Sequence, residues 1–150
     1  MVRIGSRMIS VATKENTKEL FNLESSVFSK DDFGLSVGSF YYHIKRNHLF
    51  VYKQDNKIVG YILWLKRKNN YRLYSLCIKK EFQGQGIATK LLEYSFKILE
   101  TKSFTLEVKT INKSAIKLYE KNNFKIKKVL KNYYPNNIDG YLMYRSSNGI

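Results

Sequence analysis

The chain has 150 residues, of which 43% are hydrophobic and 15% aromatic, and its 27 Lys and Arg against 12 Asp and Glu give a formal net charge of +15. That length supports one hydrophobic core, so we expect a single domain over residues 1–150. No apolar run reaches the roughly 18 residues of a membrane span, and residues 1–10 lack the apolar core of a signal peptide. These two observations predict a cytoplasmic protein without a membrane partner. The single Cys77 excludes an internal disulfide, and His43 and His48 have no familiar ligand spacing, so we expect no metal.

The N-terminal half is predicted to form a strand, two helices and three further strands. Residues 7–13 read as a short strand, after which Thr13 is placed to cap a helix to about Glu24, and Ser36 to open a second helix. Three strand-like segments follow, and the first two are joined by a hairpin: 48–53, 57–66 and 71–80. These three strands predict an antiparallel meander.

The C-terminal half is predicted to alternate helices and strands. Apolar residues at helical spacing indicate a helix from about Gly84 to Leu99, and a strand is expected at 104–109. A second helix is expected at 112–123, where Asn112 can cap the start and Asn123 suits the left-handed position at the end. Strands at 124–134 and 140–145 surround a loop that contains Pro135. The predicted order is β-α-α-β-β-β-α-β-α-β-β.

The most informative local pattern is the segment from Tyr74 to Ala88, YSLCIKKEFQGQGIA, in which a strand meets a turn and then a helix. Gly84 and Gly86 allow a tight turn, and the free N–H groups at the start of the helix favour an anion. A Walker loop would require Lys and Ser or Thr after Gly86, and a dinucleotide fingerprint would require a third glycine. The glycines alone leave open a turn that binds no ligand.

Two motifs stand in this order of elements, one from Gln83 to Ala88 and one from Leu106 to Phe124, and together they resemble the GCN5-related N-acetyltransferases (GNAT). Gln83, Gly86 and Ala88 fit the first family signature. The segment LEVKTINKSAIKLYEKNNF resembles the second block of the protein N-terminal branch, and the matching residues are Glu107, Asn112, Ala115, Leu118, Tyr119 and Phe124. The segment from Tyr133 to Met143 resembles that of the ribosomal-protein-alanine acetyltransferases. The resemblance implies an α+β GNAT fold, with a mostly antiparallel, seven-stranded mixed sheet flanked by about four helices.

The sequence departs from the family pattern in three places. Asn123 stands where a glycine usually ends the helix, and Gln83 replaces the more common Arg at the head of the loop. The acidic-Ala pair of the last strand is Asp139 and Gly140, in a loop that helps to shape the acceptor groove. These changes bear on cofactor affinity and on the acceptor more than on the fold.

The resemblance implies transfer of an acetyl group from acetyl-CoA to an amine by direct attack in a ternary complex. Glu107 is the candidate base, acting through water, and Tyr119 the candidate acid for the leaving thiolate; the simpler interpretations are an exposed strand Glu and a core Tyr. Candidate acceptor contacts are Glu24, Phe28 and Tyr134. Candidate cofactor contacts are Leu76, Cys77, Ile78, Gln83, Gly84, Gln85, Gly86, Ile87, Ala88, Thr89 and Asn112.

The acceptor is predicted from ionisation. An α-amine with a pKa near 8 is about 10% neutral at pH 7, whereas fewer than about one lysine in a thousand is neutral. This favours the N-terminal α-amine of a protein or peptide, with a ribosomal protein among the candidates, and leaves a lysine or small amine such as a polyamine as the alternative. We expect a monomer or weak dimer.

Two hypotheses of other kinds remain open. The charge of +15 also suits a basic RNA- or ribosome-binding module, although the basic residues form no nucleic-acid motif and the acetylation hypothesis does not require nucleic acid. Cys77 could act as a nucleophile in a two-step mechanism. However, no His lies beside it in the sequence, and a strand cysteine is more often inert.

Overall fold

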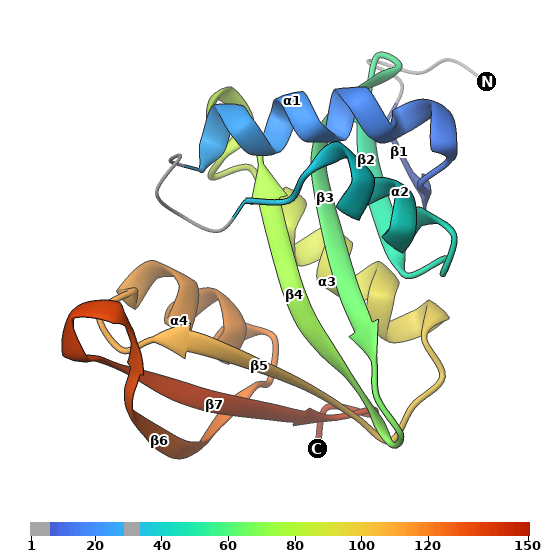
Figure 1. Cartoon of the computed structure of the whole chain (residues 1–150). Helices are drawn as coiled ribbons and strands as arrows, with labels where there is room; N and C mark the ends of the chain where they lie inside the picture. Colours follow the sequence, from blue (N-terminus) through green and yellow to red (C-terminus); the bar gives the residue numbers. More distant parts are fainter. Residues whose placement is uncertain (1–6, 29–33) are drawn as a thin grey trace. The chain divides into compact units, whose positions relative to one another are not determined.

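The computed structural model describes residues 7–28 and 34–150 (Figure 1). Residues 1–6, part of the segment 1–10 that was assessed above for a signal-peptide core, lie outside the described residues. Within the described ranges the strands form a seven-stranded mixed sheet of order β1-β2-β3-β4-β5-β7-β6, accompanied by four α-helices. This confirms the predicted fold class and order of elements. None of these helices combines the length and the apolar character that crossing a bilayer requires.

The chain divides into two compact units. The first comprises Met1–Trp64 and Ser75–Ser95, and the second Leu65–Tyr74 and Phe96–Ile150. The expectation of a single domain over the whole chain stays a prediction.

The first unit is built on an antiparallel meander. Strand β1 (Arg7–Val11) pairs with β2 (Leu49–Gln54), and β2 pairs with β3 (Lys57–Lys66). Helices α1 (Thr17–Val27) and α2 (Val37–Ile44) cover one face of these strands, and the first part of α3 (Ile87–Ile98) covers the other (Figure 1). Buried side chains fill the interior, among them Leu20, Leu23, Phe40, Val51, Tyr61 and Leu63.

The starts of the two N-terminal helices test the predicted caps. Ser36 caps α2 as predicted, because its side chain accepts the Ser39 N–H at 3.0 Å. Thr13 instead precedes a short 3-10 helix, and α1 begins at Thr17. The Asn16 side chain accepts the Thr13 N–H at 2.8 Å and the Thr17 hydroxyl donates to the Lys14 carbonyl at 2.6 Å, and these local bonds favour the tighter turn.

The second unit holds the C-terminal part of the sheet. The first residues of β4 (Asn70–Ile78) pair in parallel with β5 (Ser103–Lys109), which pairs antiparallel with β7 (Ile138–Ser146). Strand β6 (Lys125–Tyr134) pairs with β7 and forms the edge. Helix α4 (Lys113–Lys121) is followed by Asn123 at φ 69°, the left-handed conformation predicted from the sequence.

Alternation along β5 separates two faces of this unit. Phe104, Leu106 and Val108 are buried on one face together with Met143 of β7. The guanidinium of Arg145, on the same face, donates to the carbonyl of Asn122 at 2.9 Å and lies over the Phe96 ring. The end of α4 is therefore fixed to this buried face. The opposite face carries Glu107.

Candidate active site

The turn between β4 and α3, in the first unit, is the place where the sequence predicts an anion, and we call this turn the cradle. Strand β4 ends at Ile78, a 3-10 turn covers Lys80–Phe82, and Gly84 and Gly86 follow with φ angles of 80° and 81°. These left-handed angles favour glycine and cannot continue into a helix, so α3 begins at Ile87 and not at Gly84 as predicted. The predicted glycine turn itself is confirmed.

The cradle is open on its glycine side. A Cβ atom added at Gly84 or at Gly86 would meet no atom within 4 Å. The first N–H groups of α3 have no acceptor within the helix, and the positive end of the helix dipole lies at this point. The space, the donors and the field therefore fit a diphosphate group.

The side chain of Gln83, the glutamine at the head of the loop, forms a hydrogen bond next to the loop itself. The Gln83 amide donates to the Ile78 carbonyl at 2.9 Å, and the Gln85 amide donates to the Glu81 carbonyl at 3.5 Å. Gln83 therefore holds the turn against the end of β4. Its predicted contact with a cofactor stays a prediction.

The end of β4 is closely packed in the first unit. Cys77 is 1% exposed, and burial raises the pKa of its thiol to about 12, with the nearby charge of Glu24 adding to the shift. A thiol with this pKa remains protonated at neutral pH and is a poor nucleophile, which argues against the two-step mechanism. On β3, a Cβ at Gly60 would come within 2.8 Å of Ile78 Cδ1 and 3.3 Å of the Cys77 carbonyl.

Glu24 and Phe28, the candidate acceptor contacts from the N-terminal part, have structural partners. Glu24 is buried, and its carboxylate accepts the N–H of Leu35. A Cβ at Gly34 would lie 2.8 Å from both carboxylate oxygens, so Glu24 ties α1 closely to the segment that leads into α2. Phe28 is half-buried against the core. Their role in acceptor binding stays a prediction.

Glu107 lies on β5 in the second unit and is held by two side chains. Its side chain is 14% exposed, and Nε of Arg72 lies 2.8 and 2.9 Å from its two carboxylate oxygens. The Tyr133 hydroxyl donates to Oε1 at 3.2 Å. The hydrogen bond to Glu107 raises the pKa of Arg72, although burial opposes the shift. Glu107 is thus a charge-compensated acceptor with a fixed orientation, unlike an exposed strand glutamate.

Arg72 and Tyr133 are the functional candidates that the sequence did not predict. Arg72 pairs with Thr105 across the parallel strands, which places its side chain on the face that carries Glu107. The alternation of side chains along β4 does predict that Arg72 lies on the face of the strand opposite to that of the buried Tyr71 and Leu73. The register that joins it to a residue 35 positions away has no local signal in the sequence.

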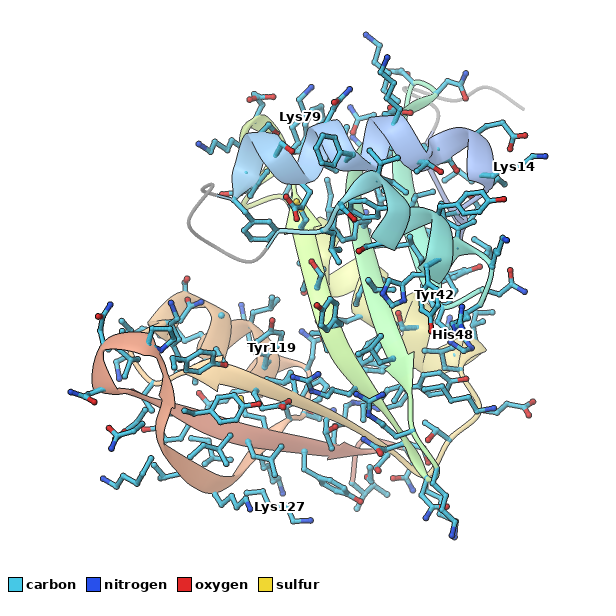
Figure 2. All side chains as sticks on the ribbon, viewed as in Figure 1. Lys14, Tyr42, His48, Lys79, Tyr119 and Lys127 are labelled. Atoms are coloured by element: carbon cyan, nitrogen blue, oxygen red, sulfur yellow. The ribbon has the colours of Figure 1, made fainter. Side chains whose placement is uncertain are left out.

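Tyr119 on α4 and Tyr134 at the end of β6 are both half-buried (Figure 2 labels Tyr119). Burial, and secondarily Tyr134, raises the pKa of Tyr119 to about 12. Burial first, then Glu107 and Tyr133, raises the pKa of Tyr134 to about 12. The Tyr119 ring also packs edge-on against Phe124, with the ring centres 5.9 Å apart, as expected of a core tyrosine. Both phenols remain protonated far above neutral pH.

Gly140 and Asn112 have distinct local roles. A Cβ at Gly140 would come within 2.9 Å of Cε2 of Tyr134, so the missing side chain leaves room for that ring. Asn112 caps α4, and its side chain accepts the Ala115 N–H at 3.3 Å. The predicted cap is confirmed, and a cofactor contact of Asn112 stays a prediction.

Comparison with known proteins gives consistent results. The model of the acetyltransferase (GNAT) domain family matches residues 45–126. The N-alpha-acetyltransferase of Saccharolobus solfataricus is 41% identical over a match that covers 69% of this chain and 72% of that protein.

Solved structures share the fold, and two of them serve as examples. The crystal structure of the ribosomal-protein-S18-alanine N-acetyltransferase from Escherichia coli has a TM-score of 0.82 at 24% identity and covers 94% of both chains. Arabidopsis thaliana Naa50, in complex with the bisubstrate analogue CoA-Ac-MVNAL, has a TM-score of 0.80 at 22% identity and covers 94% of this chain and 99% of its own. At these identities the likeness concerns the fold.

Proposed function

The chain belongs to the GNAT acetyltransferase family, and from this membership we propose that it transfers an acetyl group from acetyl-CoA to the N-terminal α-amine of a protein or peptide. That the chain is an N-acetyltransferase confirms the prediction from the sequence. The observation that carries the choice of acceptor is the similarity to an N-alpha-acetyltransferase at 41% identity. The greater neutral fraction of an α-amine supports the same choice.

The cradle of the first unit is proposed to hold acetyl-CoA. The backbone from Gly84 to Thr89 would bind the diphosphate, because its open space and helix N–H groups fit an anion. The peptide groups of Leu76–Ile78 would pair with the pantetheine arm. When bound, the cosubstrate supplies an acetyl group as an activated thioester.

Glu107 is proposed to guide the proton that leaves the attacking amine. Arg72 compensates its charge and fixes its carboxylate, so we assign Glu107 the role of accepting a hydrogen bond from the amine or from a water that takes the proton. The hydroxyl of Tyr133 also donates a hydrogen bond to Oε1 of Glu107, and this bond limits the directions from which the acceptor amine can approach the carboxylate.

Tyr119 is proposed to donate a hydrogen bond to the departing sulfur. Its pKa of about 12 keeps the phenol protonated, as the role requires. A thiol near pKa 8.5 is a stronger acid than this phenol, so complete proton transfer from Tyr119 to the thiolate would be uphill. We therefore assign Tyr119 mainly to stabilising the thiolate, a narrower role than the acid predicted from sequence.

The alternative hypotheses are less well supported. A lysine or small-amine acceptor does not follow from the N-alpha-acetylating relative, and an RNA-binding module does not follow from membership of an enzyme family. A ribosomal protein as acceptor, action in the cytoplasm and a monomeric or weakly dimeric state remain predictions.

The test compares cofactor binding and turnover in the same variants. We expect acetyl-CoA to raise the melting temperature of wild type, Glu107→Gln and Tyr119→Phe, while turnover of peptide N-termini falls in both variants. The matched control Glu120→Gln, an exposed glutamate on α4, should retain it. The proposal fails if millimolar acetyl-CoA gives no thermal shift, and the residue roles fail if both variants turn over at the wild-type rate.

A further inference from the structure

The register of the second unit gathers one set of side chains on the face that carries Glu107. Across β5 and β7, Glu107 lies opposite Leu142 and Thr105 opposite Tyr144. Across β7 and β6, Leu142 lies opposite Lys128 and Tyr144 opposite Lys125. Side chains opposite one another share a face, so Glu107, Lys125 and Lys128 belong to the same surface. The buried residues and the end of α4 occupy the other face.

Two more lysines belong to this surface, and the ammonium group of each lies over an aromatic ring. Nζ of Lys127 lies 5.0 Å from the centre of the Tyr144 ring. Nζ of Lys109, two residues beyond Glu107 on β5, lies 5.6 Å from the centre of the Tyr134 ring. We call Lys125, Lys127 and Lys128, all on β6, the lysine row.

The charge of the row is uncompensated among the residues that the structure describes. Glu107 is paired with Arg72, and Asp139, at the start of β7, is paired with Lys131 at 3.6 Å. No carboxylate within the described ranges forms an ion pair with a lysine of the row. Lys125, Lys127 and Lys128 are exposed, so their ammonium groups are available to an external anion.

The distance from Glu107 to the row corresponds to a few residues of extended peptide. Neighbouring strands lie about 4.8 Å apart, which places the Lys128 backbone roughly 10 Å from that of Glu107, two strands away. An extended chain advances about 3.3 Å per residue. A peptide whose first residue lies at Glu107 therefore reaches the row with its third or fourth residue.

We propose that this enzyme prefers acceptors with Asp or Glu at the third or fourth position, and that Lys125, Lys127 and Lys128 bind those carboxylates. The proposal rests on the proposed function, because it places the acceptor amine at Glu107. Exposed charge pairs contribute little individually, so we expect the three lysines together to lower KM for such acceptors by about tenfold at low salt.

The test uses three peptides that are identical except for Glu-Glu, Gln-Gln or Lys-Lys at positions three and four. The wild-type enzyme should show the highest kcat/KM on the Glu-Glu peptide and the lowest on the Lys-Lys peptide, and the difference should shrink as salt is raised. The triple variant Lys125→Gln, Lys127→Gln, Lys128→Gln should lose this order. The control triple variant Lys113→Gln, Lys117→Gln, Lys121→Gln, with the same charge change at exposed positions of α4, should keep it.

Each outcome bears on one proposal. Equal kcat/KM on the three peptides overturns the inference while α-amine acetylation stands, whereas no acetylation of any of them overturns the proposed function. Loss of the preference in the α4 variant too would assign it to the total charge and overturn the role of the row. If the triple variant fails to bind acetyl-CoA, the single variant Lys128→Glu decides: it must weaken the preference for Glu-Glu, and an unchanged preference contradicts the proposal.

Discussion

Glu107 and Arg72 show how the immediate partner of a residue changes its chemical role. A carboxylate without a cation nearby could serve as a simple base, but Glu107 faces a guanidinium that lies within 2.9 Å of both its oxygens. Arg72 therefore acts as a positioning residue, since it orients the carboxylate and compensates its charge.

Replacing Arg72 tests this role. We expect Arg72→Gln to lower kcat on the order of 10- to 100-fold, because Glu107 loses its orientation, while acetyl-CoA still raises the melting temperature. Arg72→Lys should recover only part of the activity, since an ammonium lacks the planar guanidinium geometry. Steady-state kinetics on one peptide provides the measurement, with the exposed Arg67→Gln as the matched control. Wild-type kcat in Arg72→Gln would show that the ion pair has no part in turnover.

The pKa of Tyr119 gives a prediction for the pH dependence. Activity should rise with pH as the acceptor α-amine, with a pKa near 8, loses its proton. Because burial raises the pKa of Tyr119 from 10.0 to about 12, the phenol should cause no loss of activity below pH 10. The contribution of the neutral phenol to the free energy of unfolding is likewise complete below pH 10, and it is lost as the pH rises from 10 to 12. A kcat profile with a descending limb near pH 10 in wild type and not in Tyr119→Phe would contradict this.

At the scale of elements, the packing of β3 against the end of β4 and the start of α3 depends on the close approach of Gly60 to these two elements. Gly60 lies where Ile78, the Cys77 carbonyl and Ile87 meet, and a Cβ there would stand 2.8, 3.3 and 3.4 Å from their nearest atoms. The position therefore controls both the end of β4 and the start of α3, the two parts of the proposed cofactor site.

A pair of glycine substitutions tests this packing. Gly60→Ala should lower the free energy of unfolding by about 1–3 kcal/mol through overpacking, and should also weaken acetyl-CoA binding. Gly38→Ala is at an exposed position of α2, where the nearest atom, Ser36 Oγ, would lie 3.8 Å from the new Cβ. This substitution should raise the free energy of unfolding by about 0.5–1 kcal/mol because alanine favours a helix. Urea denaturation measures both changes. Equal effects of the two substitutions would show that Gly60 is not closely packed in solution.

The sequence predicted those elements whose signals are local. The glycine turn, the Ser36 and Asn112 caps and left-handed Asn123 all follow from residues within one turn of the feature. The start of α1 differed because Asn16 and Thr17 form competing local bonds. The Arg72–Glu107 pair and the face of the lysine row depend on strand register, which arises from contacts between distant segments.

For the whole molecule, the charge of +15 is unevenly distributed along the sequence. Between Gly34 and Lys80 the chain contains ten Lys and Arg and a single acidic residue, Asp55. A positive field of this kind raises the local concentration of anionic partners and weakens as salt is added. Both proposed substrates, an anionic cosubstrate and an acidic acceptor, are of the kind that such a field attracts.

The most direct measurement of the central claim locates the transferred acetyl group. A peptide with a free N-terminus and one internal lysine is incubated with the enzyme and acetyl-CoA beside a twin whose N-terminus is blocked, and both are sequenced by tandem mass spectrometry. We expect the acetyl group on the α-amine of the first peptide, release of one equivalent of free thiol, and no modification of the twin. Acetylation of the lysine in both peptides, with the α-amine left free, would contradict the account.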